Sequence, residues 1–373
     1  MSLESRDLPD VEDVRARVDL LIAAHTSRLR ATLAQIGAGS EPLADAVEQM
    51  LSGGKRLRAA FCYWSWRAHG GTPGSPDEVA VLRVGAALEL FQAAALFHDD
   101  VMDDSDTRRG HPAAHRAFAV RHDDQGLEGS AERFGMSAAI LLGDLALVAS
   151  EQEFAAAMVG APPVLGQRAR GVFDLMRTEV TVGQYLDVVA QSTPWSLDAS
   201  LDEARAREVI RAKSARYSVE HPMVLGAALA GATDAELDAV RALGLPLGEA
   251  FQLRDDLLGV FGDPATTGKP AGDDLREGKR TVLVARTVAH AHERDDVVTL
   301  DRLRSTLGDR SASDDDVAQL TRAIRASGAV DDVELLIAEL SARAFAGIAA
   351  RSWPEPANAM VVALAHAAVD RTA

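Results

Sequence analysis

The sequence LFHDDVMDDSDTRRG, residues 96–110, places five aspartates within eight positions and follows them with two adjacent arginines. Carboxylates at this spacing repel one another, so a solvated acidic surface is the simplest interpretation. The alternative is that a strongly positive group binds the aspartates and a strongly negative group binds above it. The choice between these two interpretations depends on the rest of the chain.

Helical geometry allows a metal site at this cluster, although a solvated surface is the commoner interpretation of one such cluster taken alone. At about 100° per residue, Gln92, Asp99 and Asp103 lie within roughly 40° of one another around a helix. Asp99 and Asp103 can therefore direct both carboxylates to one point. Mg²⁺ prefers oxygen ligands and commonly links one or two carboxylates to substrate phosphates. His98, directly before Asp99, is more typical of a packing or capping histidine than of a metal ligand.

A second acidic cluster supports the metal interpretation. The segment FQLRDDLLGVFGD, residues 251–263, places Asp255 and Asp256 near the end of an apolar helix, with Gln252 one turn earlier. Each cluster is followed by a basic, glycine-containing loop. The cations in these loops include Arg108, Arg109, Lys269 and Lys279. Carboxylates with a metal, next to arginine and lysine, are typical of a polyphosphate site.

Two further basic segments can contribute to such a site. In GGKRLR, residues 53–58, two glycines precede Lys55 and Arg58, which are three positions apart and can hold one phosphate group at a helix start. Lys213 and Ser214 lie within an apolar helical segment. A lysine there could equally extend its ammonium group to solvent.

Composition limits the class of protein. The 373 residues include 39 basic and 56 acidic side chains, a net charge of −17, which argues against nucleic acid or an anionic membrane as a partner. Cys62 is the only cysteine, so no intrachain disulfide or cysteine-based zinc site forms. The charged N-terminus lacks a signal peptide, and charges such as Asp144 interrupt the apolar stretches. We therefore expect a cytoplasmic protein without a transmembrane segment.

Apolar residues recur at three- and four-residue steps through long segments without proline, which predicts helices. Start signals of the Ser/Thr-x-x-Glu type occur at Ser75–Glu78, Ser200–Glu203 and Thr233–Glu236. The predicted helices are 10–37, 42–51, 54–69, 76–103, 112–121, 131–160, 164–190, 201–231, 234–260, 279–293, 315–327, 331–350 and 356–370. Loops are predicted at 104–111, 122–130, 191–199 and 261–278. We expect one all-α domain over residues 1–373, with disorder at 1–10.

Six segments, in this order, resemble the trans-isoprenyl diphosphate synthase (polyprenyl synthetase) family. They are GGKRLR, HDDVMDDSDTRRG, GQYLD, KSARY, FQLRDD and GKPAGDDLREGKR, and they lie within residues 53–280. The resemblance implies an isoprenoid-synthase-type helical bundle around a deep central cavity, in which two aspartate-rich helices face each other. It also implies a homodimer that condenses isopentenyl diphosphate with allylic diphosphates such as dimethylallyl, geranyl and farnesyl diphosphate.

The resemblance also implies roles for individual residues. Asp99 and Asp103 would bind two Mg²⁺ ions and Asp255 a third, with Mn²⁺ as a possible substitute. The isopentenyl diphosphate would be held by Lys55, Arg58, Gln92 and Arg109. The allylic diphosphate would be held by Arg108, Lys213, Ser214, Gln252, Lys269 and Lys279. The chain departs from many members at Gln92, where histidine is common, at Ser214, where threonine is usual, and at Gly259, where the second motif often ends in aspartate.

The implied reaction needs no nucleophilic side chain. Metal ions and cationic groups neutralise the leaving diphosphate, and dipoles of Lys213, Ser214 and Gln252 stabilise the allylic cation. The released diphosphate would accept the proton. A class I terpene cyclase shares the fold and metal clusters but needs no second diphosphate site, against which Lys55 and Arg58 argue. A non-catalytic partner subunit is expected to lose an aspartate cluster, and this chain retains both.

Product length follows from the helix below the first motif. In the family, bulky residues four and five positions before the first aspartate stop chain growth, and here these positions hold Ala95 and Ala94. Phe91 lies about 12 Å below Asp99, and Leu88 about 16 Å below it. A tail of about fifteen to twenty carbons fits this depth, so we predict geranylgeranyl diphosphate as the main product. Farnesyl diphosphate and a longer polyprenyl product remain alternatives.

Overall fold

The computed structural model describes residues 10–196, 198–262 and 272–370 of the chain. Up to the second aspartate cluster the described helices are α1 (Val14–Ile36), η1 (Ala38–Ser40), α2 (Glu41–Leu51), α3 (Leu57–Ala68), α4 (Pro76–Met102), α5 (Ala114–Asp124), α6 (Ala131–Val159), α7 (Pro163–Ser192), α8 (Ala199–Val209), η2 (Ile210–Glu220), α9 (His221–Leu229) and α10 (Asp234–Phe261). After it come α12 (Asp273–Arg276), α13 (Val282–Glu293), α14 (Val297–Thr306), α15 (Asp314–Ser327), α16 (Ala329–Ala349) and α17 (Ala357–Val369).

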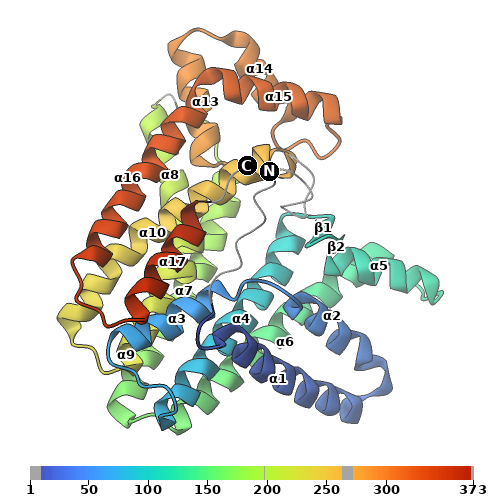
Figure 1. The fold of residues 1–373 in the computed structure, drawn as a ribbon. Helices are drawn as coiled ribbons and strands as arrows, with labels where there is room; N and C mark the ends of the chain where they lie inside the picture. Colours follow the sequence, from blue (N-terminus) through green and yellow to red (C-terminus); the bar gives the residue numbers. More distant parts are fainter. Residues whose placement is uncertain (1–9, 197, 263–271, 371–373) are drawn as a thin grey trace, which may run out of the picture.

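The all-α architecture is confirmed, with one small addition. The loop predicted at 104–111 contains β1 (Thr107–Arg108), which pairs in antiparallel register with β2 (His111–Pro112). Figure 1 shows α13, α14 and α15 grouped at the top of the molecule, while α5, which packs against α6, projects to the right. The prediction of disorder at 1–10 falls, except for residue 10, outside the described residues.

The core forms around helices that are apolar on most of their surface. Every residue of α9 is buried, α3 packs directly against it, and α4 packs mainly against α6. Close packing requires a glycine here. A Cβ added at Gly226 of α9 would lie 1.9 Å from the Cys62 carbonyl oxygen and 2.8 Å from the Trp66 backbone nitrogen. Gly226 therefore sets the distance between α9 and α3.

The predicted helix at 201–231 is wrong as a single α-helix. The structure divides it into α8, η2 and α9, and η2 is a π-helix of 11 residues. Two neighbouring helices approach η2 through glycines. A Cβ at Gly183 of α7 would lie 2.4 Å from the Lys213 backbone nitrogen, and one at Gly248 of α10 would lie 2.2 Å from the Ala215 carbonyl oxygen. Sequence periodicity does not contain these tertiary contacts.

The three predicted helix starts have different outcomes. The capping box at Thr233 and Glu236 is confirmed, because each residue bonds the backbone or side chain of the other. Ser75 precedes α4 without a side-chain cap, and Glu78 instead accepts a hydrogen bond from Arg17. The predicted signal at Ser200 is wrong, because Asp198 caps α8. Helix α14 and the single turn of α12 were not predicted.

Two described helices, α4 and α6, are long and apolar enough to cross a membrane by length and composition. The charge at Asp144 therefore does not exclude α6 on these criteria. The apolar window of α4 is 72% buried within the protein, as expected of a core helix, whereas that of α6 is 44% buried. The absence of a transmembrane segment stays a prediction, and α6 presents an apolar surface that needs an explanation.

Substituting Gly226→Ala should destabilise the protein by about 1–3 kcal/mol, because the new methyl group meets backbone atoms of α3 that cannot rotate away. Urea unfolding followed by circular dichroism measures the change. The matched control is Gly171→Ala in α7, where a Cβ meets nothing within 4 Å and the loss of a helical glycine should stabilise slightly. Equal stability of the two variants would contradict the proposed role of Gly226.

Candidate active site

The first aspartate cluster lies at the C-terminal end of α4. The backbone N–H of Asp103 donates to the Asp99 carbonyl oxygen at 2.8 Å, so the last helical turn continues through both residues and places their carboxylates one turn apart. Asp103 is buried and Asp99 is largely buried. Two lysines from distant segments reach them. Lys213 Nζ lies 2.9 Å from Asp99 Oδ1, and Lys279 Nζ lies 3.5 Å from Asp103 Oδ2.

These lysines determine the charge state of the cluster. Burial acts to raise the pKa of Asp99, but the charges of Lys213, Lys279 and Arg108 outweigh it and the pKa is lowered. Burial raises the pKa of Asp103, and the neighbouring Asp99 carboxylate raises it further. The cations therefore stabilise the Asp99 carboxylate but do not fully offset the cost of a charge on Asp103. Such a pair is suited to bind additional positive charge.

Lys213 is held by a second acid that the sequence analysis did not select. Its ammonium group donates to Asp187 Oδ2 at 2.6 Å, in addition to its contact with Asp99. Asp187 is buried on α7, in the GQYLD segment. The close approach of Gly183 to η2 brings the two helices together at this point. Lys213 thus links α4 with α7, and the half-buried Ser214 follows it on η2.

The second aspartate cluster lies near the end of α10. The Gln252 amide donates to Asp256 Oδ1 at 2.8 Å. Burial raises the pKa of Asp256 to about 7, although this hydrogen bond acts in the opposite direction. Asp255 is half-buried. The two predicted residues therefore have different surroundings, with Asp256 directed into the protein.

Lys279 brings the two clusters together. Besides Asp103, its ammonium group contacts Asp274 Oδ1 at 3.3 Å and Glu277 Oε2 at 2.9 Å, both from the segment that follows α10. The buried Glu277 also accepts a hydrogen bond from Ser105 Oγ at 2.7 Å. The loop after the first cluster is thus tied to the segment after the second. The predicted opposition of the two acidic helix ends is consistent with these contacts.

Arginines surround the same region in two groups. Arg108 donates through Nε to Asp100 Oδ1 at 2.8 Å and lies 3.5 Å from Asp99 Oδ2, so it belongs to the first cluster. Arg109 has a positive φ of 54° and donates to the Met50 carbonyl oxygen at 2.8 Å. This contact carries its guanidinium toward the end of α2, away from the aspartates.

Arg109 joins a cationic group around the GGKRLR segment. A Cβ at Gly54 would lie 3.9 Å from guanidinium nitrogens of both Arg109 and Arg56. Burial lowers the pKa of Arg109, and the like charge of Arg56 lowers it further. Arg56 is also buried between Asp19 and Glu89 and was not predicted as a site residue. Cations this close to each other favour the binding of an anion.

Arg58 extends this group toward η2. Its Nη2 donates to Ser218 Oγ at 2.8 Å, its guanidinium lies 4.1 Å from the centroid of the Tyr217 ring, and its Nε is buried without a hydrogen bond. Lys55 is exposed beside the group. Gln92 is half-buried on α4, two turns before Asp99. Lys269 lies outside the described residues.

The carboxylates fit Mg²⁺, provided that a substrate completes its coordination. Among the described residues, no three His, Cys, Asp or Glu side chains converge to hold a metal without other ligands. Three buried carboxylate oxygens have no hydrogen bond: Asp99 Oδ1, Asp103 Oδ2 and Asp256 Oδ2. The first lies next to the Lys213 ammonium group and the second next to that of Lys279. Mg²⁺ commonly uses one or two carboxylates together with phosphate oxygens. The donor set on α4 and α10 matches that mode of binding.

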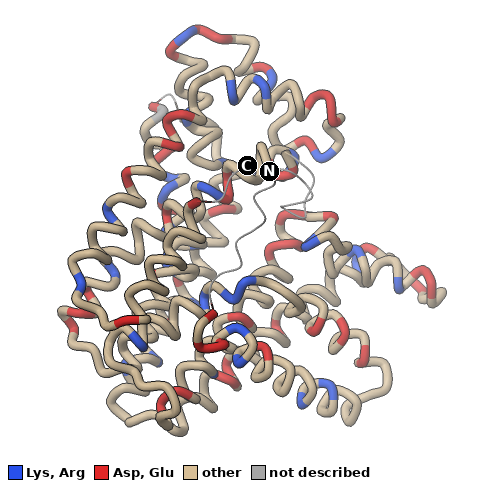
Figure 2. The backbone as a smooth tube through the Cα atoms, viewed as in Figure 1, with Lys and Arg blue, Asp and Glu red and all other residues tan. Residues whose placement is uncertain are grey.

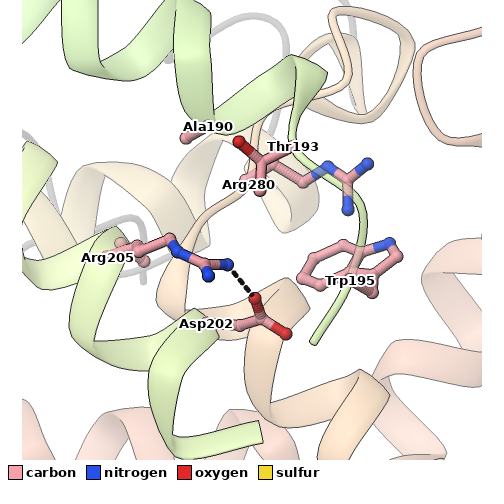
Figure 3. Close-up of a pocket in the computed structure, with 7 residues that line it drawn as sticks. Ala190, Thr193, Trp195, Asp202, Arg205 and Arg280 are labelled. Atoms are coloured by element: carbon pink, nitrogen blue, oxygen red, sulfur yellow. Dashed lines mark hydrogen bonds and ion pairs between the residues drawn. The ribbon is translucent and has the colours of Figure 1, made fainter. Parts of the chain in front are cut away.

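A small pocket lies near the site but is separate from the aspartates. Figure 3 shows the Arg280 guanidinium next to the Trp195 ring, 3.9 Å from its centroid, and Asp202 paired with Arg205 at 2.7 Å. The remaining lining residues are Ala190, Thr193 and Ala206.

Figure 2 shows acidic and basic segments next to one another along much of the backbone. The net charge of −17 thus coexists with local cationic groups.

Known proteins share both the sequence and the fold. The model of the family described as Polyprenyl synthetase matches residues 40–324. The geranylfarnesyl diphosphate synthase of Aeropyrum pernix is 32% identical over 289 residues, which cover 76% of this chain and 79% of that protein. The geranylgeranyl diphosphate synthase of Sulfolobus acidocaldarius is 30% identical over 266 residues, or 71% of each chain.

A solved structure matches over nearly the whole length. It is the geranylgeranyl pyrophosphate synthase from Corynebacterium glutamicum, complexed with isoprenyl diphosphate and magnesium. The two chains are 38% identical, with a TM-score of 0.90, and the match covers 98% of this chain and 100% of the other. This match confirms the predicted fold class.

Proposed function

Since this chain belongs to the polyprenyl synthetase family and is a prenyltransferase that elongates isoprenyl chains, we propose that its main product is geranylgeranyl diphosphate. The substrates are then isopentenyl diphosphate and the dimethylallyl, geranyl and farnesyl diphosphates. The observation that carries this product length is the packing of Phe91 on α4 against Tyr217 on η2, two helical turns below Asp99.

The two groups of cations support two separate diphosphate subsites. Arg58 and Arg109 lie with Lys55 around the GGKRLR segment, which suits isopentenyl diphosphate, and Gln92 lies on the adjacent α4. Lys213 and Lys279 contact the aspartates themselves, which suits the leaving diphosphate of the allylic substrate. The remaining residues proposed for the allylic subsite are Arg108, Ser214, Gln252 and Lys269.

Three Mg²⁺ ions complete the proposal, two at Asp99 and Asp103 and one at Asp255, with Mn²⁺ able to replace them. The family uses Mg²⁺, and the C. glutamicum structure contains it. When bound, Mg²⁺ supplies positive charge that stabilises the departing diphosphate. Lys213 and Lys279 add their own charge to the same group. The Gln252 side chain and the Lys213 carbonyl dipole are proposed to stabilise the allylic cation.

Substituting Asp99→Ala or Asp103→Ala should lower kcat about 100-fold or more, because each change removes several kcal/mol of charge stabilisation. Wild-type activity should require Mg²⁺ or Mn²⁺ and disappear in chelator. Product formation from radiolabelled isopentenyl diphosphate measures both effects. Undiminished turnover in chelator would contradict the mechanism.

The controls for this experiment also separate the alternatives. Asp315→Ala, at an exposed position of α15, should leave kcat unchanged.

Arg58→Ala should raise the Michaelis constant for isopentenyl diphosphate more than that for the allylic substrate. A terpene cyclase would form product without isopentenyl diphosphate. A non-catalytic subunit would give no turnover as a purified single chain.

The surroundings of Phe91 support the proposed product length. Ala94 is buried and Ala95 half-buried on α4, above the buried Phe91. The Phe91 ring packs edge-on against Tyr217 of η2, with 5.9 Å between centroids. An aromatic pair from two helices can close the path of a growing tail about 12 Å below Asp99. The relatives include both geranylgeranyl and geranylfarnesyl diphosphate synthases, so length is a property of this chain's own residues.

Substituting Ala95→Phe should shorten the main product to farnesyl diphosphate or less, because the ring would enter the path one turn below Asp99. Phe91→Ala should lengthen the product, because it removes half of the aromatic pair with Tyr217. Chromatography of the dephosphorylated alcohols measures both shifts. The control is Leu335→Ala, at an exposed position of α16. An unchanged distribution in both variants would place the floor of the tail path elsewhere.

We also propose that the chain forms a homodimer through adjacent faces of α6 and α7. The exposed apolar side chains of this α6–α7 face are Phe134, Met136, Ile140, Leu141, Val148, Leu175, Val182, Tyr185, Val188 and Val189. The two helices lie together, since Phe154 stacks on Phe173 at 4.0 Å and Arg177 pairs with Glu151 at 2.6 Å. An apolar surface of this extent is typical of a protein interface. A second copy accounts for the incomplete burial of α6.

The double variant Ile140→Glu and Val182→Glu should convert the dimer into a monomer, because an interface that buries four carboxylates, two from each copy, is strongly disfavoured. Light scattering after size-exclusion chromatography at micromolar concentration measures the mass. Leu335→Glu on α16 is the matched control and should remain dimeric. A monomeric wild-type protein, or one that binds lipid vesicles through this face, would overturn the proposal.

A further inference from the structure

A carboxylate from another segment occupies the space next to Gly259. A Cβ added at Gly259 of α10 would lie 1.8 Å from Asp274 Oδ2 and 2.5 Å from Asp274 Cγ. Gly259 is four residues after Asp255, on the same face of the helix. The Asp274 carboxylate thus fills the volume into which any side chain at position 259 would extend.

The chain holds Asp274 in this position by several contacts. Gly272, with a positive φ of 73°, starts the turn of α12, and Leu275 is buried beneath it. The Lys279 backbone N–H donates to the Asp274 carbonyl oxygen at 3.0 Å, and the Lys279 ammonium nitrogen lies 3.3 Å from Asp274 Oδ1. The turn of α12 and the contacts with Lys279 therefore orient this carboxylate toward α10.

The surrounding charges show that Asp274 belongs with the second cluster. Asp256 is 93% buried, and its Oδ2 has no hydrogen-bond partner. The Asp274 carboxylate lies against the position of Gly259, three residues after Asp256 on the same helix. The Lys279 ammonium group contacts both the Asp274 carboxylate and the Asp103 carboxylate. Asp274 thus faces both aspartate clusters.

We propose that Asp274 supplies the carboxylate that the second aspartate motif lacks at Gly259. The metal-binding group at the end of α10 then consists of Asp255 from the helix and Asp274 from α12. Gly259 is required because only glycine leaves room for that carboxylate. The inference rests on the proposed function, since it assumes a metal ion at Asp255.

A purely structural role for Asp274 makes a different prediction. Among the described residues its side chain pairs with Lys279, which also contacts Glu277 at 2.9 Å and Asp103 at 3.5 Å. Asp274→Asn should therefore leave Lys279 held by two other carboxylates. If Asp274 served only the fold, this variant would change thermal stability but not metal affinity.

The test measures the affinity and number of bound Mn²⁺ ions by electron paramagnetic resonance, with inorganic diphosphate present. Asp274→Asn should weaken the weakest Mn²⁺ site about 10-fold. Gly259→Ala changes no charge but displaces the Asp274 carboxylate, so it should weaken the same site similarly. The double variant Gly259→Asp with Asp274→Ala moves the carboxylate onto α10 and should recover most of the affinity. Gly171→Ala and Asp315→Asn are the matched controls.

The outcomes separate this inference from the proposed function. A wild-type protein that binds no Mn²⁺ with diphosphate would overturn the proposed metal centre and the inference with it. If the wild type binds and Asp274→Asn and Gly259→Ala bind equally well, only the inference is wrong. If the double variant binds Mn²⁺ no more tightly than Asp274→Asn does, a carboxylate at position 259 cannot replace the one at position 274, and the inference is refuted. Circular dichroism of each variant verifies the fold, and Gly259→Ala supplies the answer if Asp274→Asn does not fold.

Discussion

Two lysine ammonium groups hold together carboxylates that would otherwise repel one another. Lys213 lies between Asp99 and Asp187, and Lys279 lies between Asp103 and the acids of the segment after α10. Buried carboxylates in contact with like charges are costly unless cations neutralise them. Because these lysines come from η2 and from the segment before α13, they tie the C-terminal half of the chain to α4. The arrangement of the bundle around the site depends on these contacts.

Local geometry made half of this site predictable from sequence. Asp99 and Asp103 are one helical turn apart, and the capping box at Thr233 needs only four consecutive residues, so periodicity and spacing were sufficient. The position of Lys213 was a weaker prediction, since an interior lysine can also extend to solvent. Its role becomes clear only through Asp187, 26 residues earlier on a different helix. The GQYLD segment contained that aspartate, but nothing local connected it to Lys213.

The unpredicted contacts around the site arise from tertiary structure. The π-helix η2 forms where α7 and α10 press against it through Gly183 and Gly248, and helical periodicity cannot distinguish it from an α-helix. Glu277 and Ser105 are separated by 172 residues and meet because both follow an aspartate cluster. An ordinary polar residue in a loop carries no local signal of such a partner. Sequence therefore predicts the acids on each helix better than the contacts between helices.

The glycines near the site differ in what they face, and the difference matters for function. Gly183 and Gly248 face backbone atoms of η2, which cannot move without separating two helices, so a side chain there would disturb the bundle. Gly259 faces only the end of the Asp274 side chain, which can rotate. A substitution at Gly259 would thus redistribute negative charge while the helices stay in place. The same absence of a Cβ controls packing at the first two positions and the electrostatics of the second aspartate cluster at the third.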